Sequence, residues 1–458
     1  MLGWVMLAML KFSQIMLGWS AEFALIVTTL FALLHTISSG MWGVVILDML
    51  HFTAGVISTI ILAILILFNV GGPTALSEQI LARTDAPEGV LDMLPNFAHI
   101  SPIEFAGYLC LIGVLWLGQA QGDGYIVQRL FSAKNEKNAV RASLWFAVAG
   151  IVILTWPWII VGLGSIVILP ISEATPELLA DPELAYPMMI VEVLPAGLKG
   201  LLVAAFMAAF MSTVDTHLCW GSSYVVNDIY KRFIQPDANP KHYVLVSRIS
   251  IIILLLLSTL AAWHMDSIAG AWIYIIEIMS GIAIIALLRW FWWRINAWSE
   301  ITTMLLALLL VNGHLFLKLL HHLGSITAQT LTQALVFYQD EYALIRATAV
   351  LIICTIVILV VTLLTKPVEQ ETLLHYYKKL KLNGWWQPIA IQAPEVIPDG
   401  NITKNWSGFL LGVLFLNSLL FAVGHLVIGN YIWGFGLAFF SAFSAWGTIR
   451  AMESVVEN

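Results

Sequence analysis

Apolar segments of about 20 residues recur along the whole chain, separated by short polar stretches. A helix of that length crosses the ~30 Å hydrocarbon core of a bilayer. We therefore predict an all-α polytopic membrane protein with about twelve spans, over residues 1–19, 21–38, 41–69, 103–120, 141–170, 188–228, 244–263, 267–289, 300–320, 343–365, 405–427 and 430–449. The stretch 188–228 is too long for one straight span, so Pro195 predicts a short helix or re-entrant turn before the main one.

Basic residues between these segments gather in alternate connections. Sixteen lie on one predicted side and four on the other: Arg129, Lys134, Lys137, Arg141, Lys231, Arg232, Lys241, Arg248, Arg289, Arg294, Lys366, Lys378, Lys379, Lys381, Lys404 and Arg450, against Arg83, Lys199, Lys318 and Arg346. Because cytoplasmic loops are enriched in Lys and Arg, we expect residues 121–141, residues 366–404 and both termini to be cytoplasmic, in an inner or plasma membrane. Four tryptophans beside Arg294 predict an aromatic belt at the inner interface: Trp290, Trp292, Trp293 and Trp298.

The composition agrees with a membrane environment. The chain is 60% hydrophobic and 11% charged, with a mean hydropathy of +0.89, whereas soluble chains are about 25% charged. The net charge of -7 is spread over several loops, which argues against a nucleic-acid partner. The three cysteines lie inside apolar runs without zinc-ligand spacing, so we expect no cofactor of that kind.

One span has small and hydroxyl-bearing residues near its middle. On a helix, the carbonyl of Ala209 and the hydroxyls of Ser212 and Thr213 converge on one face, because they are three and four positions apart. Neutral, hard oxygens suit an alkali cation, so this spacing is typical of half of a sodium site. The alternative is that these residues only allow close helix packing and hydrogen bonding across an interface.

The segment AAFMSTVDTHLCWGSSYVVNDIYKRF, residues 208–233, strongly resembles the eighth core helix of the sodium:solute symporter family, which includes sodium/glucose and sodium/proline symporters. Further segments resemble the start of its fifth core helix (38–48), the region after its sixth (124–134) and the end of its tenth in a bacterial branch (289–298). The resemblance implies a leucine-transporter-like core of two inverted repeats, alternating access and no enzymatic chemistry. It places the sodium ligands at Ala209, Ser212 and Thr213.

The same resemblance predicts a domain organisation. Residues 1–300 match core helices three to ten, and residues 301–458 are expected to be additional transmembrane helices with a polar cytoplasmic loop at 366–404. Core helices one and two, which supply the other sodium ligands in the family, are then expected to be missing from the chain as given. Either the native start lies upstream of Met1, which we favour, or the protein is a degenerate product.

Ionisable residues inside spans cost at least ~2.5 kcal/mol on insertion scales and are therefore candidates for function. We assign Asp48 and Asp215 to a cation path, and for Asp215 the alternative is a hydrogen bond to a neighbouring helix. Glu277 is assigned to substrate binding, the alternative being a structural partner. His35 is expected to be a packing histidine, and Lys11 to extend towards the interface.

Gln121 and Asp123 lie in a polar, glycine-containing stretch at the end of an apolar segment. Two glycines beside polar side chains predict unwinding of a helix at membrane depth, which is tolerated only beside a cavity. We therefore assign both residues to substrate binding.

These features together predict sodium-coupled symport of a small polar organic solute by alternating access. Sodium is the coupling ion, no other cofactor is expected, and the partners are the solute, sodium and the lipid bilayer. The alternatives are an inactive or truncated fragment of such a symporter, or a channel or sensor on the same scaffold.

Overall fold

The computed structural model describes residues 1–38, 41–94, 96, 100–110, 130–170, 172, 174–339, 342–398 and 402–456. Over these ranges the backbone is helical, apart from turns, loops and one isolated bridge between Trp292 and Trp385. The chain divides into two compact units. The first comprises Met1–Met93, Val127–Ile268 and Gly408–Glu457, and the second comprises Leu94–Ile126 and Ala269–Ser407.

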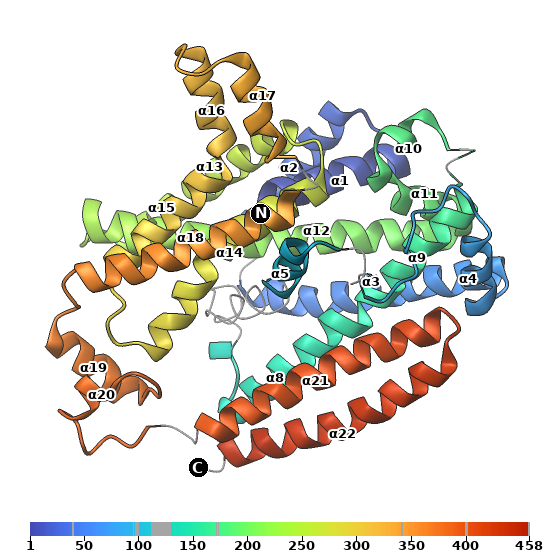
Figure 1. Ribbon diagram of the computed structural model, residues 1–458. Coiled ribbons are helices and arrows are strands. Elements are labelled where there is room, and N and C mark those ends of the chain that lie inside the picture. The colour runs from blue at the N-terminus through green and yellow to red at the C-terminus, as the bar shows by residue number, and fades with distance from the viewer. Residues whose placement is uncertain are drawn as a thin grey trace. The chain divides into compact units, whose positions relative to one another are not determined.

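The first unit contains most of the predicted core. Its helices are α1 (Leu2–Leu17), α2 (Ala21–Ser38), α3 (Met41–Val70), α4 (Pro73–Leu81), α8 (Glu136–Val148), α9 (Thr155–Ile168), α10 (Pro176–Ala180), α11 (Ala185–Val193), α12 (Ala196–Tyr224), α13 (Pro240–Trp263), α21 (Ile402–Val427) and α22 (Tyr431–Val456). Two π-helical segments, η2 (Ala149–Ile153) and η5 (Val225–Ile234), and the short 3-10 helix η4 (Pro182–Leu184) complete it. The helices α21 and α22 lie side by side (Figure 1).

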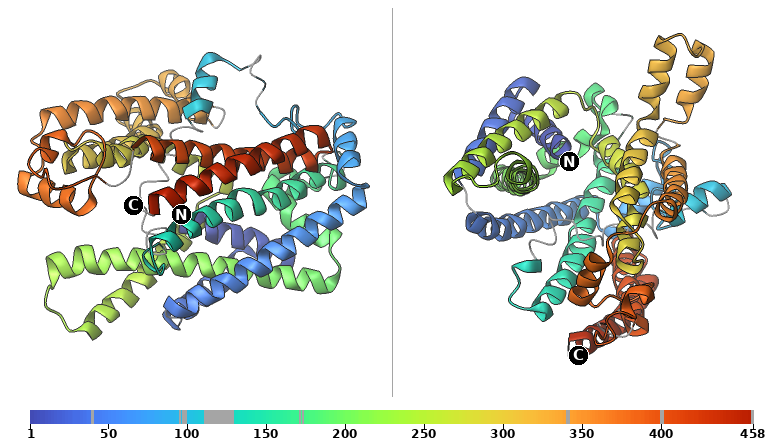
Figure 2. Two further views of the ribbon diagram at one scale, coloured as in Figure 1. Left: turned by 90° about the horizontal axis from the view of Figure 1, so that it is seen from below. Right: turned by 90° about the vertical axis from the view of Figure 1, so that its left-hand side faces the viewer.

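The second unit is built on three long apolar helices. It contains α5 (Pro102–Cys110), α14 (Ile268–Phe291), α15 (Ala297–Val311), α16 (Gly313–His322), α17 (Ala328–Val336), α18 (Ala343–Leu364), α19 (Gln370–Leu380) and α20 (Gln387–Ala390). The helices α16 and α17 form a hairpin that projects from the rest of this unit (Figure 2).

Eight helical segments in the described residues are long and apolar enough to cross a membrane, and two bent pairs raise this number to as many as ten. The polytopic all-α prediction is therefore confirmed, although the expected count of about twelve is not reached within these residues. The ranges 1–19 and 21–38 form one bent pair with an angle of 117°. Gly18 ends α1 at φ 65°, a left-handed conformation that glycine adopts without steric cost. Of the expected span 103–120, only residues 103–110 are described.

Side-chain caps define where several helices begin. The Asn135 side chain accepts a hydrogen bond from the Asn138 amide at 2.9 Å, and Asn296 accepts one from the Ser299 amide at 3.1 Å. Asn239 caps α13 in the same way, and Pro240 occupies its first turn, where no backbone donor is needed. Polar residues at these positions therefore separate apolar segments that would otherwise merge.

The core of the first unit surrounds α12. This helix contacts α1, α2, α3 and α13, and its residues Phe210, Val214 and Leu218 are buried in the main hydrophobic cluster. Large apolar side chains on the outer face of α13, such as Leu256 and Leu257, are more than half exposed, as expected for a surface that faces lipid. The candidate sodium motif is thus held on a helix that its neighbours fix firmly.

The range 366–404, which we expected to be a polar connection, forms a folded module instead. Within residues 366–398, α19 and α20 pack around a small cluster of buried residues: Leu373, Tyr377, Trp386, Ile389 and Ala393. Gly384 has φ 107° and lies against the backbone of Phe291, where a side chain would collide with the Phe291 carbonyl. The module therefore depends on contacts with the end of α14 that a count of polar residues does not reveal.

Candidate functional site

The helix α12 carries the predicted sodium motif, and the sequence explains where it begins. A break at Pro195 was predicted, and the structure confirms it: α11 ends at Val193 and α12 starts at Ala196. Because proline has no backbone donor, the first turn of α12 loses no hydrogen bond there. The motif then lies in the middle of a 29-residue helix.

The three predicted ligands lie on the less buried side of α12. Ala209 is exposed, and Ser212 and Thr213 are partly buried, whereas Phe210 and Val214 are buried in the core. The Thr213 hydroxyl donates a hydrogen bond to the Ala209 carbonyl at 2.9 Å. Because a hydroxyl oxygen keeps its lone pairs when it donates, this oxygen can still face a cation. The sodium role of the three residues stays a prediction.

A histidine that we did not assign to the site lies beside it. The Nδ1 atom of His217 is 2.8 Å from the carbonyl oxygen of Thr213, one turn away on the same helix. The Oγ1 atom of Thr216 is buried and has no hydrogen-bond partner within the described residues. The i, i+4 spacing of His217 and Thr213 is the sequence signal that could have indicated the first of these contacts.

Asp215 is almost completely buried, with 1% of its surface exposed, and its carboxylate joins α12 to α2. One carboxylate oxygen accepts a hydrogen bond from the Thr36 hydroxyl, and the other contacts Nδ1 of His35. The structure thus shows the interhelical hydrogen bond that we named as the alternative for Asp215. His35 packs as expected, but its specific partner lies 180 positions away in the sequence.

Glu277 also has a structural partner. Its Oε1 atom accepts hydrogen bonds from Nη2 and Nε of Arg346 at 2.6 and 3.1 Å, and both side chains are buried. Arg346 donates two further hydrogen bonds, to the carbonyls of Phe337 and Gln339. All of these residues belong to the second unit, and this arrangement favours the structural alternative for Glu277. Its assignment to substrate binding stays untested.

Lys11, which we expected to extend towards the interface, is paired with acidic residues of the first unit. Only 7% of the residue is exposed, and its ammonium group lies 2.7 Å from Asp181 and 2.6 Å from Glu183. It also donates a hydrogen bond to the Asp266 carbonyl at 3.0 Å, and the same Glu183 carboxylate accepts the Ile268 amide. The sequence does not indicate this network, because its members come from three separate parts of the chain.

Three of the assigned residues fall outside what the structure describes. Gln121 and Asp123 lie in the range 111–129, so the predicted unwinding there is not described. Asp48 belongs to α3, but its side chain is not among those described. Their roles stay predictions.

Comparison with known proteins decides the family. The sequence model described as the "Sodium:solute symporter family" matches residues 5–307, which include α12 and its motif. The chain belongs to the sodium:solute symporter family. The sodium/glucose cotransporter of Vibrio parahaemolyticus is 27% identical over 300 residues, which cover 61% of this chain and 54% of that relative. Sodium/glucose cotransporter 4 of Danio rerio is 25% identical over 432 residues, which cover 85% of this chain and 63% of that relative.

The chain thus spans between about half and two thirds of the length of these relatives, which are named as cotransporters and not as enzymes. A solved structure of a Na+-coupled sialic acid symporter, in a substrate-bound outward-open state, matches with a TM-score of 0.52 and 19% identity. That match covers 80% of this chain and 75% of the symporter. It confirms the predicted leucine-transporter-like fold of this multi-pass membrane protein.

Proposed function

We propose that this chain forms part or all of a sodium-coupled symporter that moves a small polar organic solute by alternating access. Ala209, Ser212 and Thr213 contribute one half of its sodium site, and other parts of the protein supply the remaining ligands. The coupled solute belongs to the broad class of polar organic molecules that the relatives' names indicate.

The observation that supports this proposal most strongly is the family match over residues 5–307, which include α12. Within that part, Thr213 and Ala209 lie on the less buried side of α12, and the Thr213 hydroxyl oxygen is 2.9 Å from the Ala209 carbonyl oxygen. Neutral carbonyl and hydroxyl oxygens are ligands that suit a monovalent, weakly held cation, while a divalent ion would require more negative charge.

The distribution of basic residues supports the orientation in the membrane. We propose that both termini and the module at 366–398 are cytoplasmic, in an inner or plasma membrane. Arg294 lies at the same end of the second unit, where it donates hydrogen bonds to the carbonyls of Thr362 and Leu363 at the end of α18. A cation at a helix C-terminus is favourable because the helix dipole is negative there.

Binding of radioactive sodium to the purified chain in liposomes tests the half-site. In a form that also carries the native sequence upstream of Met1 we expect saturable binding, and far weaker binding in the chain as given. In the longer form, the double variant Ser212→Ala/Thr213→Ala should raise the apparent sodium Kd at least about tenfold, since each oxygen contact to a charged group is worth about 1.5 kcal/mol or more. Ser223→Ala is the matched control, because this hydroxyl lies on the same helix and donates to the Trp220 carbonyl. An equal rise of the apparent sodium Kd in the control variant would contradict the assignment. An unchanged sodium Kd in the double variant would contradict it as well.

Transport itself is tested by sodium-driven uptake into the same liposomes. Glucose, mannose, myo-inositol and sialic acid are the first solutes to try, because the matched relatives are named for them. A symporter gives saturable uptake that stops when the sodium gradient is removed. Solute flux that is independent of the gradient would indicate a channel on the same scaffold.

A further inference from the structure

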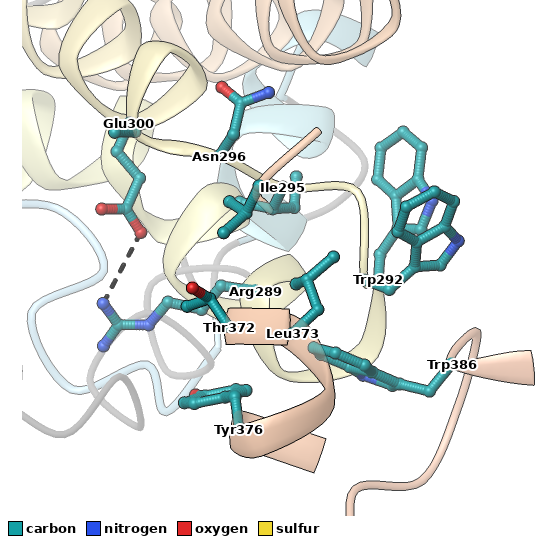
Figure 3. A pocket seen from close by; sticks show the side chains of 12 residues that line it. Arg289, Trp292, Ile295, Asn296, Glu300, Thr372, Leu373, Tyr376 and Trp386 are labelled. Atoms are coloured by element: carbon teal, nitrogen blue, oxygen red, sulfur yellow. Dashed lines mark ion pairs between the residues drawn. The ribbon is translucent and has the colours of Figure 1, made fainter. Parts of the chain in front are cut away.

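A pocket of about 270 Å³ lies where the folded module at 366–398 meets the end of α14 and the start of α15. Figure 3 shows its charged members, Arg289 and Glu300, pointing towards each other, with Thr372 and Tyr376 from α19 on the adjoining wall. Trp292 and Trp386 supply aromatic surface. All of these residues belong to the second unit.

Backbone contacts fix the aromatic wall. The Trp386 indole donates a hydrogen bond to the Trp290 carbonyl at 2.9 Å, and the Trp385 amide donates one to the Phe291 carbonyl at 2.7 Å. Trp386 is buried, and its ring stacks on Tyr377 with centroids 6.1 Å apart. The pocket is therefore preformed by packed side chains, as small-molecule sites usually are.

Two opposite charges lie close together in the pocket. Nη1 of Arg289 lies 3.7 Å from Oε1 of Glu300, and each side chain is between a third and a half exposed. A guanidinium has five N–H donors and a carboxylate has two acceptor oxygens, so each group can contact a third molecule while this ion pair is kept. Burial raises the pKa of Tyr376, so its hydroxyl stays protonated and can donate to an anion.

The pocket lies at the depth where helix spans end. Several of its residues, among them Arg289, Trp292 and Val368, are within a few positions of the last residues of α14 and α18, Phe291 and Leu364. Close to these residues in the sequence, Trp298 is 65% exposed and Leu364 is 82% exposed, which offers apolar surface for acyl chains. Because the ends of membrane spans meet the headgroup region, we expect this pocket to lie level with phospholipid headgroups.

We propose that this pocket binds the phosphoethanolamine headgroup of a phospholipid. The guanidinium of Arg289 binds the phosphate, since its planar donors match phosphate oxygens. The primary ammonium donates to Glu300 and the Thr372 hydroxyl, and it lies against the aromatic wall. A choline headgroup has no N–H to donate, and a glycerol headgroup has no cation, so the pair of charges selects ethanolamine. This inference does not depend on the proposed transport function.

Lipid binding to the purified full chain tests the assignment. In native mass spectrometry after titration, phosphatidylethanolamine should bind about fivefold more tightly than phosphatidylcholine or phosphatidylglycerol of the same acyl composition. Glu300→Gln should reduce this preference to within about twofold, and Arg289→Gln should weaken binding of phosphatidylethanolamine and phosphatidylglycerol alike. Lys379 lies in the same module but outside the pocket, so Lys379→Gln should change neither the lipid affinities nor the preference for phosphatidylethanolamine. Equal binding of the three lipids by the unaltered protein would overturn the proposal.

A second measurement needs no variant. A phosphatidylethanolamine with an unaltered headgroup and a photoreactive group near the start of one acyl chain should label peptides 289–300 and 370–386 more strongly than any others, and labelling spread evenly over the spans would overturn the site. Soluble phosphoethanolamine distinguishes the source of the ligand. If it displaces the lipid only at millimolar concentration, the lipid is the ligand. If it binds as tightly as the lipid, the assignment to a phospholipid is wrong.

Discussion

The guanidinium of Arg346 and the carboxylate of Glu277 form a buried ion pair, with 2.6 Å between Nη2 and Oε1, although the two residues are 69 positions apart. The ring of Tyr338 lies 5.8 Å from the guanidinium carbon, and Ser280 links the backbones of Glu277 and Ala347 through its hydroxyl. The pair thus joins α14 to α18 through several contacts. A buried charge without its partner is costly, which makes this pair a point where one substitution has large effects.

We expect Arg346→Met to destabilise the protein by about 3–5 kcal/mol, because it leaves Glu277 as an unpaired buried charge and removes the donor to two carbonyls. Glu277→Gln should cost less, since the amide still accepts from Arg346. Thermal unfolding in detergent measures both. Lys378→Met, which breaks an exposed ion pair with Glu395, is the control and should change little. If Glu277→Gln altered solute affinity at unchanged stability, the substrate assignment would be favoured instead.

The contact of Asp215 with α2 leads to a second prediction. Asp215→Ala should destabilise the protein by about 1–3 kcal/mol, because the buried Thr36 hydroxyl and the His35 ring lose their shared acceptor. Asp215→Asn keeps an acceptor oxygen and should cost less. Under the structural role, the asparagine variant binds sodium as the unaltered protein does. A rise of about tenfold in its sodium Kd would instead place Asp215 in the cation path.

Local features of the chain predicted the break before α12 but not the partners of its polar residues. Pro195 interrupts a helix because it has no backbone donor, and that effect depends only on neighbouring residues. The pairing of Asp215 with His35 depends on how two helices pack, and nothing near either residue in the sequence indicates it. The partners of Lys11, two carboxylates that lie about 170 positions away, were not predicted for the same reason.

The module at 366–398 escaped prediction for a different reason. Its helices α19 and α20 contain 11 and 4 residues, which is too short to cross a bilayer, so a search for long apolar segments passes over them. Charged residues such as Lys378 and Lys379 made the segment look like a solvated loop. Its core residues lie in small groups between these charges, a pattern that only tertiary contacts make recognisable.

A third prediction concerns acid sensitivity at the loop after α4. Hydrogen bonds from the Arg83 guanidinium hold the pKa of Asp85 below its ordinary value of 3.8. A lowered pKa means that this contact stabilises the loop above about pH 4 and is lost as the pH falls through the folded-state value. The amide hydrogen-exchange rate of residues 83–92, corrected for the intrinsic rate at each pH, should therefore be constant from pH 7 to about pH 4 and should rise below pH 4. Asp85→Asn should show no such step, and a step that persists in this variant would contradict the prediction.

Orientation is tested by labelling single cysteines in a background without the three native ones. We expect a membrane-impermeant maleimide to modify Lys318→Cys on α16 in intact cells, because the exposed hairpin lies on the predicted outer side. Lys134→Cys and Lys379→Cys should react only after the cells are opened. Modification of residue 379 from outside would reverse the proposed topology of the second unit.

Two adjacent tryptophans provide the sharpest test of the module. Trp386 is 3% exposed, stacks on Tyr377 and donates to the Trp290 carbonyl, whereas the side chain of Trp385 is mostly exposed. Trp386→Ala should destabilise the module by about 3–5 kcal/mol, because it leaves a cavity and a carbonyl without its donor. Trp385→Ala keeps the backbone hydrogen bond to Phe291 and should have little effect. Trypsin cleavage after Lys381 measures the opening of the module, since cleavage follows the population of the open form when reclosing is fast. We expect cleavage at least about tenfold faster in Trp386→Ala than in Trp385→Ala, and equal rates in the two variants would show that residues 366–398 do not fold around Trp386.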